Sequence, residues 1–326
     1  MNLRFAFRRL AAQPGFALVA VLSLGIGIGA TALFFGFLNA TLLKPLPVER
    51  PEELFSLVEP RFGAPVTSYP NYLDLKKRSE TMDLVCYRIA PMNASLGGGR
   101  NSRIWGYLVS GDYFQMLGVQ AAAGRLITPA DDEKRGGHPV AVISYASWQG
   151  RFGGKREVVG SSVKLNGREY TILGVTPPGF IGTERFYAAE IFVPVAMTAL
   201  VEPGATYLDD RDIQNTFVLG RLRSGATKAR AEANLKALLA GLAREYPKEN
   251  EGLTLKLVGR GWVGECLRGG VVALSAVLIT VAALLLLVVC VNLASLLLAR
   301  ASERRKETAI RLAIGAGRGQ LVGQLL

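Results

Sequence analysis

Histidine and cysteine are scarce in this sequence, whose 326 residues include one histidine, His138, and three cysteines. A structural zinc site takes about four Cys or His ligands at short spacings, and His138 has no such neighbour. We therefore interpret His138 as a loop residue. Cys86 and Cys266 are candidates for a disulfide, although their spacing fits no known framework, whereas Cys290 lies in an apolar run and is expected to contribute to packing.

Motifs for nucleotide hydrolysis and acyl transfer are also missing from the sequence. The nearest approach to a P-loop is Gly154-Lys155, which has Gln149 where the first glycine should be and Arg156 where a Ser or Thr is needed. No G-x-S-x-G elbow occurs. We expect no enzyme activity and no cofactor, and we expect that the chain cannot hydrolyse ATP by itself.

Two acidic runs are the remaining candidates for a polar site. They are Asp131-Asp132-Glu133 and Asp209-Asp210-Arg211-Asp212, both in stretches that read as loops. We interpret both as solvated surface, with weak cation binding as the alternative.

Acidic residues are outnumbered by basic ones, 26 against 38, which gives a net charge of +12. Residues 44–268 hold 29 basic and 24 acidic side chains, whereas residues 1–43 and 269–326 together hold 9 and 2. The excess therefore lies beside the apolar ends of the chain, which is typical of cytoplasmic segments of membrane proteins. We expect contact with membrane lipid and no nucleic-acid partner.

Two long uncharged runs, Leu10–Leu43 and Gly269–Ala299, predict membrane-spanning helices, because roughly 20 apolar residues cross a bilayer. A signal peptide is the alternative for the first run, but its apolar core would be only about 7–15 residues long. Gly25 and Gly29 form a G-x-x-x-G pattern, which predicts close packing against another helix, although Gly29 and Thr31 are also ordinary residues for a membrane helix.

The basic residues around these runs predict the topology. Arg4, Arg8 and Arg9 precede the first run, and Arg300 and Arg304 follow the second. Both termini are therefore expected in the cytoplasm and the long central segment outside it. The first 13 residues, basic and with interspersed apolar side chains, predict an amphipathic helix on the cytoplasmic face.

The central segment has a mixed pattern of strands and helices. Strands are predicted at Glu53–Val58, Leu84–Ala90, Ile104–Val109, Pro139–Ser144, Val163–Val175 (a hairpin around Asn166-Gly167), Asn215–Leu222 and Leu253–Val258. Helices are predicted at Ser68–Lys77, with Ser68 as cap, at Gly111–Gly118 and at Thr227–Tyr246. A β-α-β unit thus opens the segment, a strand-rich stretch follows, and a second β-α-β unit closes it.

We therefore predict an α+β membrane protein, in which two transmembrane helices flank a two-lobed extracytoplasmic domain. We call residues 44–119 and 213–268 the flank, and residues 120–212 the insert. The predicted segments are 1–13 (cytoplasmic amphipathic segment), 14–43 (first span), 44–268 (outer domain), 269–299 (second span), 300–318 (cytoplasmic amphipathic segment) and 319–326 (start of a third span).

Two groups of sequence segments resemble those of a known family. The stretch Glu307–Ala316, ETAIRLAIGA, resembles the E-x-x-I-R-x-A-x-G-A stretch after the second transmembrane helix of MacB/FtsX-type ABC transporter permeases. "VSGDYFQMLGV", "AGRLITPADD", "VAVISYASWQGRFGG" and "VVGSSVKLNGREYTILGVTPPGF" resemble the periplasmic core domain of the MacB family. The resemblance covers essentially the whole chain.

The resemblance implies that the segment 300–318 is a coupling helix that docks on an ATPase subunit. The residues expected at that contact are Arg304, Glu307, Ile310, Arg311 and Gly315. Glu307 and Arg311 are four apart, so an ion pair within the helix is the alternative reading. The family also implies that the flank is nearer the membrane than the insert, and that two permeases pair with two ATPases in the bacterial inner membrane, with a periplasmic adaptor as a further partner.

We predict a permease subunit of an ABC transporter that transmits the motion of a separate ATP-binding subunit to a periplasmic domain, for efflux or mechanotransmission. Family members have four spanning helices, so a chain ending at Leu326 is expected to be a fragment or a truncated, non-functional permease. A two-span membrane receptor with an outer sensor domain has the same topology, but the glycines after Arg311 and the apolar ending favour the transporter. An anchored outer enzyme lacks a catalytic constellation.

Overall fold

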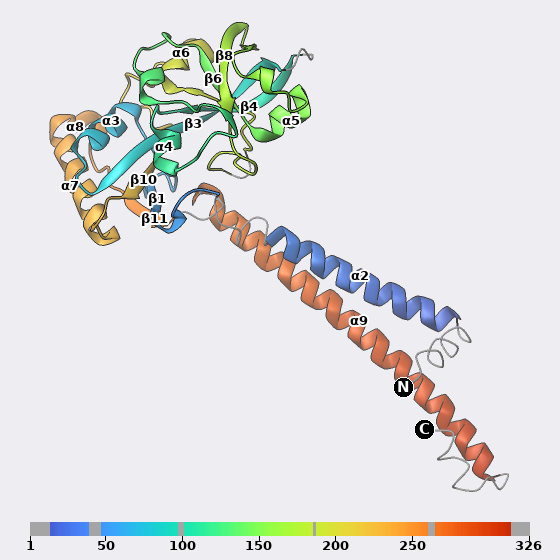
Figure 1. Cartoon of the computed structure of the whole chain (residues 1–326). Helices are drawn as coiled ribbons and strands as arrows, with labels where there is room; N and C mark the ends of the chain where they lie inside the picture. The colour runs from blue at the N-terminus through green and yellow to red at the C-terminus, as the bar shows by residue number, and fades with distance from the viewer. Residues whose placement is uncertain (1–13, 39–46, 97–100, 185–186, 260–264, 314–326) are drawn as a thin grey trace. The chain divides into compact units, whose positions relative to one another are not determined.

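A computed structural model of the chain describes residues 14–38, 47–96, 101–184, 187–259 and 265–313 (Figure 1). The chain divides into two compact units, which are described separately. Residues Thr41–Val271 form the outer unit, and Met1–Ala40 with Val272–Leu326 form the helical unit.

The outer unit mixes helices with an eleven-stranded sheet, which confirms the predicted α+β class. Its strands are β1 Leu54–Val58, β2 Val66–Thr67, β3 Met82–Ser95, β4 Ser102–Val109, β5 Ala123–Gly124, β6 Val140–Ile143, β7 Ser162–Leu165, β8 Arg168–Val175, β9 Ile191–Pro194, β10 Thr216–Leu222 and β11 Lys256–Gly259. Its helices are α3 Tyr69–Arg78, α4 Tyr113–Leu117, α5 Tyr145–Phe152, α6 Thr198–Val201, α7 Lys228–Glu245 and α8 Pro247–Asn250, with 3-10 turns η2 Pro51–Glu53, η3 Pro129–Asp132, η4 Arg156–Val158 and η5 Val195–Met197.

Six of the strands close into a barrel. β3 pairs with β4, β4 with β9, β9 with β6, β6 with β8, β8 with β7, and β7 returns to the far end of β3. The other strands continue the sheet in the order β11-β1-β10, and β10 pairs with Met82–Tyr87, which we call the near half of β3. The rest of β3 is its far half. The 14 residues of β3 therefore belong both to the barrel and to the flank, and one sheet runs through flank and insert without interruption.

Alternate residues of the barrel strands fill its interior, as the period of two along a strand requires. The inward residues, which share one hydrophobic core, are Ala90, Met92, Ala94, Ile104, Leu108, Ala141, Ile143, Val163, Leu165, Tyr170, Ile172, Ile191 and Val193. Gly106 lies at an inward position of β4, where an added Cβ would be 2.4 Å from Sδ of Met92. The long Met92 side chain thus occupies space that Gly106 leaves open.

Two further cores lie outside the barrel. The residues that alternate with the inward ones along the barrel strands, including Tyr107 and Phe192, pack with Tyr113 and Phe114 of α4. In the flank, α3 and α7 bury Tyr72, Leu235 and other apolar residues against β1, β10, β11 and the near half of β3. Figure 1 shows α3, α7 and α8 gathered at the β10–β1–β11 end of this unit.

Local signals predicted several elements correctly. Ser68 caps α3 by accepting from the Asn71 N–H over 3.3 Å, and Thr227 caps α7 in the same way. Asn166 and Gly167 both have positive φ, 47° and 81°, as the turn of a two-residue hairpin requires. The pairing of β3 with β7 and the short elements β9 and α5 were not predicted.

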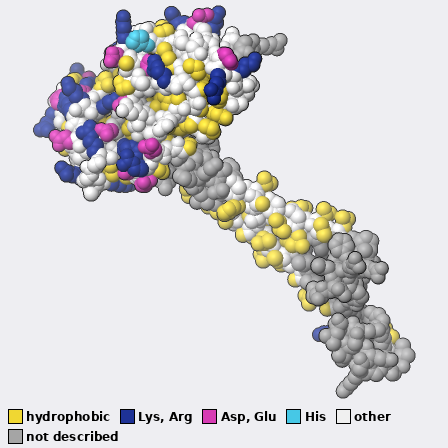
Figure 2. Space-filling view, in the orientation of Figure 1, with side chains coloured by type: hydrophobic (Ala, Val, Ile, Leu, Met, Phe, Trp, Pro, Cys, Tyr) yellow, Lys and Arg dark blue, Asp and Glu magenta, His cyan; other side chains and the backbone are white. Residues whose placement is uncertain are grey.

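The helical unit contains α2, Pro14–Leu38, and α9, Glu265–Ala313. Within the described residues, one stretch, Val272–Asn292 of α9, is long and apolar enough to cross a membrane, and Leu24–Gly36 of α2 is a shorter apolar stretch. Figure 2 shows hydrophobic side chains over the described parts of both helices. The helix α9 continues without a break beyond the apolar stretch into the basic segment, as far as Ala313.

Candidate functional site

The predicted ATPase contact lies on the last turns of α9 and just beyond them. Ile310 is 60% exposed, which leaves an apolar side chain at the surface of this unit. Arg304, Glu307 and Arg311 lie in the α-helical backbone, whose period puts these three positions on one face. Their side chains, and the whole of Gly315, lie outside the described residues.

The contact between α2 and α9 is made through Gly27. This glycine is buried, and a Cβ added to it would be 3.2 Å from Cγ2 of Val289. On α9, Ser275, Ala282 and Val289 are the buried residues of the described side chains and are spaced by seven, which is the repeat of a left-handed helix pair.

Gly25 and Gly29, the predicted packing residues, do not take part in this contact. Both are exposed, and an added Cβ at either position would meet nothing within 4 Å. The close approach therefore uses the glycine between them, which the G-x-x-x-G pattern does not select.

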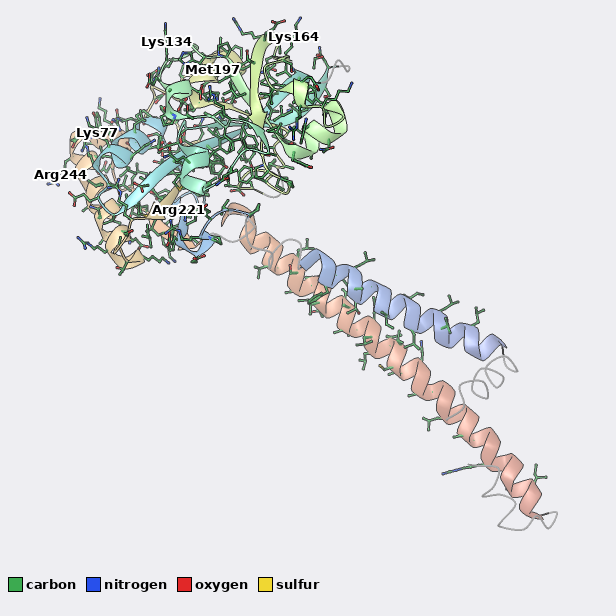
Figure 3. All side chains as sticks on the ribbon, in the orientation of Figure 1. Lys77, Lys134, Lys164, Met197, Arg221 and Arg244 are labelled. Carbon is green, nitrogen blue, oxygen red and sulfur yellow. The ribbon has the colours of Figure 1, made fainter. Side chains whose placement is uncertain are left out.

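The point where the chain enters the outer unit is held by Arg221 of β10, labelled in Figure 3. Its guanidinium is largely buried and donates to the carbonyl oxygens of Glu49, Arg50 and Met116, and to the carboxylate of Glu53. Next to these hydrogen bonds of Arg221, β1 pairs antiparallel with β11, the last strand before α9. The entry and exit strands of the outer unit are therefore neighbours.

The prediction that the run Asp209–Asp212 is solvated surface is wrong for Arg211. Its side chain is only 15% exposed, and it donates to Oδ1 of Asn71 over 2.6 Å and to Asp74 over 2.5 Å. A buried guanidinium needs such partners, because an unpaired charge is costly to desolvate. Asp209, in contrast, is exposed and pairs with Arg135.

The same prediction is wrong for Asp131 and holds for Glu133, which is exposed. Asp131 closes a capping box with Thr128 and accepts two hydrogen bonds from Arg125, at 2.6 and 2.8 Å. The Arg125 guanidinium, helped by Thr128, lowers the pKa of Asp131 to about 2. This carboxylate is therefore a structural cap rather than a free cation ligand.

The remaining candidates give no site for chemistry. His138 is exposed in a loop, as predicted. Cys86 is a free thiol that is completely buried, and burial raises its pKa, so it is a packing residue; Cys266 lies outside the described side chains. Within the described ranges, no group of three His, Cys, Asp or Glu residues is arranged to hold a metal ion.

Two family models match the chain. The MacB-like periplasmic core domain matches residues 17–238, and the FtsX-like permease C-terminal model matches residues 279–326. The Bdellovibrio bacteriovorus protein named macrolide export ATP-binding/permease protein MacB is 26% identical over 226 residues, which are 69% of this chain and 33% of that protein. A protein of the same name from Burkholderia cenocepacia is 27% identical over 225 residues, 67% of this chain and 30% of that protein. The chain thus spans about a third of the length of these curated relatives.

Solved structures also resemble the chain. A permease-protein domain from Porphyromonas gingivalis matches with a TM-score of 0.50 and 14% identity, and covers 66% of this chain and 94% of that domain. The periplasmic region of MacB from Actinobacillus actinomycetemcomitans matches with a TM-score of 0.46 and 16% identity, over 60% of this chain and 79% of that one. At such identities the likeness concerns the fold alone.

Proposed function

Because the chain belongs to the MacB/FtsX family of ABC transporter permeases, we propose that it transmits ATP-driven motion of a separate ATPase to its outer unit. Family members work with an ATPase. The finer proposal concerns how this chain conveys the motion, through one helix that belongs to both units.

The continuity of α9 carries the proposal. This helix begins at Glu265, among the residues of the outer unit, and runs through the apolar stretch Val272–Asn292 to Ala313. A continuous ladder of backbone hydrogen bonds makes a helix stiff. Breaking this ladder, for example with a proline in the helix interior, costs about 3 kcal/mol. A tilt or rotation imposed on its basic end is therefore passed along a stiff element toward β11.

The strand order supports a coordinated response in the outer unit. β11 directly precedes α9, and its partner β1 follows the segment that leaves α2. A displacement of β11 acts on β1, on β10 and through β10 on β3, whose far half is a barrel strand. We propose that motion reaches the barrel by this route.

We further propose the predicted topology, with both termini in the cytoplasm and the outer unit in the periplasm of an inner-membrane protein. The basic residues beside both apolar helices support it. Gly25 and Gly29 have an open face on α2, and we propose that this face packs against another helix of the assembly, in a pair of permeases or in the rest of a longer chain. A periplasmic adaptor would dock on the outer unit.

The ATPase contact can be tested with charge reversals on one face of α9. Glu307→Lys and Arg311→Glu should each reduce co-purification of the ABC ATPase that the wild-type chain retains, while membrane insertion is unchanged. Arg305→Glu is the matched control, because position 305 lies on a different face of the helix.

A swap variant separates docking from an ion pair within the helix. The double variant Glu307→Arg with Arg311→Glu keeps an ion pair between positions 307 and 311, but it exchanges the charges that these two positions present to the ATPase. Loss of the ATPase in the swap supports docking. Full retention of the ATPase by the swap and by both single variants would show that these residues are not the contact.

A further inference from the structure

The strand β11 forms one edge of the sheet in the outer unit. It pairs with β1 and has no strand on its other side among the described residues. In an antiparallel ladder the backbone groups of alternate residues point to opposite sides of the strand. The Leu257 N–H points away from β1, because it donates to Oε2 of Glu232 on α7 over 3.0 Å. The backbone groups of Leu257 and Gly259 therefore face outward.

A single carboxylate protects this edge. An open strand edge is a template for a further strand, and proteins usually cover or charge it. Glu232 accepts from the Leu257 N–H and pairs with Lys236 over 2.7 Å, and its side chain is 22% exposed. Within the described ranges, the outward groups of Leu257 and Gly259 make no other hydrogen bond. A carbonyl oxygen of an added strand would replace Glu232 as acceptor, and Glu232 would keep Lys236 as its partner.

The helix α7 leaves a hollow beside the edge. It has a volume of about 520 Å³ and is lined by Lys228, Ala229, Glu232, Ala233 and Lys236. Both alanines are exposed, whereas Ala231 and Leu235 of the same helix are buried in the core of the flank. Glu232 belongs both to the lining of the hollow and to the edge contact, so the hollow lies next to β11. One face of α7 thus packs on the sheet, and a second face is left open beside the sheet edge.

This open face is positively charged. Lys228 and Lys236 are eight residues apart on α7, a rise of about 12 Å. Lys236 is paired with Glu232, whereas Lys228 lies over the Phe55 ring, 5.8 Å from its centroid, and has no ion pair within the part of the chain that the structure describes. Lys256 of β11 is exposed and likewise has no ion pair there. Three lysines against one glutamate make the surroundings of the edge favourable for an anionic ligand.

We propose that the edge of β11 and the open face of α7 together bind an extended, acidic segment of a partner protein, which adds to the sheet as one more strand. Main-chain hydrogen bonds to Leu257 and Gly259 supply affinity, and the side chains that face α7 supply specificity. Side chains i, i+2 and i+4 of a strand point to one face, and i and i+4 are about 13 Å apart. Acidic residues at i and i+4, with an apolar residue at i+2, therefore match Lys228, Lys236 and the alanines between them.

The charges also argue against a second copy of this chain at the edge. Two copies paired through β11 would bring their own lysines at positions 228, 236 and 256 together, and like charges oppose association. An acidic segment is attracted instead. Because β11 is the last strand before α9, the partner would be attached next to the helix that carries the proposed motion. The inference goes beyond the proposed function, and its test requires no ATPase.

Fluorescence anisotropy on the full chain in detergent micelles tests the proposal. The labelled probe Thr-Glu-Thr-Val-Thr-Glu-Thr has its acidic and apolar residues at the required spacing, and Thr-Lys-Thr-Val-Thr-Lys-Thr is its control. The wild type should bind the acidic probe saturably, with a Kd below about 1 mM, and the basic probe far more weakly. Lys228→Glu with Lys236→Glu should weaken binding of the acidic probe about tenfold, because two attractive contacts become repulsive. The matched control is Lys77→Glu with Lys248→Glu, at exposed lysines of α3 and α8, and should bind as the wild type does.

Backbone methylation distinguishes an added strand from a peptide that is held by charge alone. A strand donates to its neighbour from alternate residues only, along one edge. Two forms of the acidic probe carry N-methyl groups on the odd or on the even residues. One form should lose about tenfold or more in affinity, and the other should bind nearly as well as the unmodified probe.

Three results would overturn the proposal. They are the absence of saturable binding of the acidic probe to the wild type, equal losses of affinity in the two double variants, and equal binding of the two methylated forms. A disulfide between two copies of a Gly259→Cys variant, formed without peptide in a background free of other cysteines, would also overturn it, because the occupant would then be a second copy. Gly259 suits this control, since a Cβ added there meets nothing within 4 Å.

Discussion

The guanidinium carbon of Arg211 lies 3.8 Å from the centroid of the Tyr246 ring. Arg211 belongs to the last residues of the insert, and Tyr246 joins α7 to α8 in the flank. Arg211 also donates to Asn71, whose side-chain amide exchanges two hydrogen bonds with the side-chain amide of Asn250. A single cation thus connects the end of the insert to α3 and to the junction of α7 and α8 in the flank.

Replacing this cation by lysine should destabilise the outer unit. Arg211→Lys keeps the charge but loses the planar group that stacks on Tyr246 and reaches two acceptors on α3. We expect the free energy of unfolding to fall by about 1–3 kcal/mol, because buried partners are left without donors. Urea unfolding of the full chain in detergent, followed by tryptophan fluorescence, measures it. Arg103→Lys is the control, since Arg103 is exposed and has no ion pair within the described residues. Equal midpoints for both variants would contradict the role of Arg211.

The cap at Asp131 should stabilise the protein in a defined pH range. The carboxyl pKa is lowered to about 2 by Arg125, so ionised Asp131 stabilises the fold above its unfolded pKa of about 3.9, and this contribution is lost as the pH falls toward 2. Asp131→Asn should be less stable than the wild type by about 1 kcal/mol or more at pH 7. The difference should be constant from pH 7 to 5 and shrink below pH 4. A difference in unfolding midpoints that does not change down to pH 2 would argue against an ionised cap.

Local sequence signals predicted elements better than they predicted connections. The cap at Ser68 and the Asn166-Gly167 turn are decided by neighbouring residues, and both occur as expected. The return of β7 to Ala94 and Ser95 of β3 joins residues about 70 positions apart, and no local pattern encodes it. The closed barrel was therefore not predictable from periodicity, although its strands were largely identified.

The prediction that the acidic runs are solvated surface was wrong for a related reason. Asp131, Asp132 and Arg211 occur in polar loop sequences, and composition alone assigns such residues to the surface. The fold brings Arg125 to Asp131, the Gly111 N–H to Asp132, and Asn71 to Arg211. The paired Thr128 and Asp131 at the start of a turn, a capping box with Asp in the third position, was the one local signal that could have identified a structural role.

Gly106 and Met92 should be energetically coupled inside the barrel. Gly106→Val alone places atoms where the Met92 sulfur lies, so we expect a loss of about 1–3 kcal/mol from overpacking. Met92→Ala alone leaves a cavity and should cost about 2–5 kcal/mol. The double variant should be more stable than the sum of these losses predicts, because the valine fills space that the methionine vacates. Strictly additive losses in urea unfolding would mean that the two side chains do not share one space.

The α2–α9 contact gives a geometric test in the membrane. A Cβ added to Gly27 lies 3.8 Å from Cβ of Val289, which is the usual separation in a disulfide. In a background with Cys86, Cys266 and Cys290 replaced by alanine, Gly27→Cys with Val289→Cys should therefore crosslink on mild oxidation. Pairs of Val289→Cys with Gly25→Cys or Gly29→Cys should react far less, since these glycines have no neighbour within 4 Å. The shift in gel mobility, reversed by reductant, reports the bond. Equal yields from all three pairs would mean that α2 does not present one fixed face to α9, and preferential reaction at Gly25 or Gly29 would put the G-x-x-x-G face, rather than Gly27, against this helix.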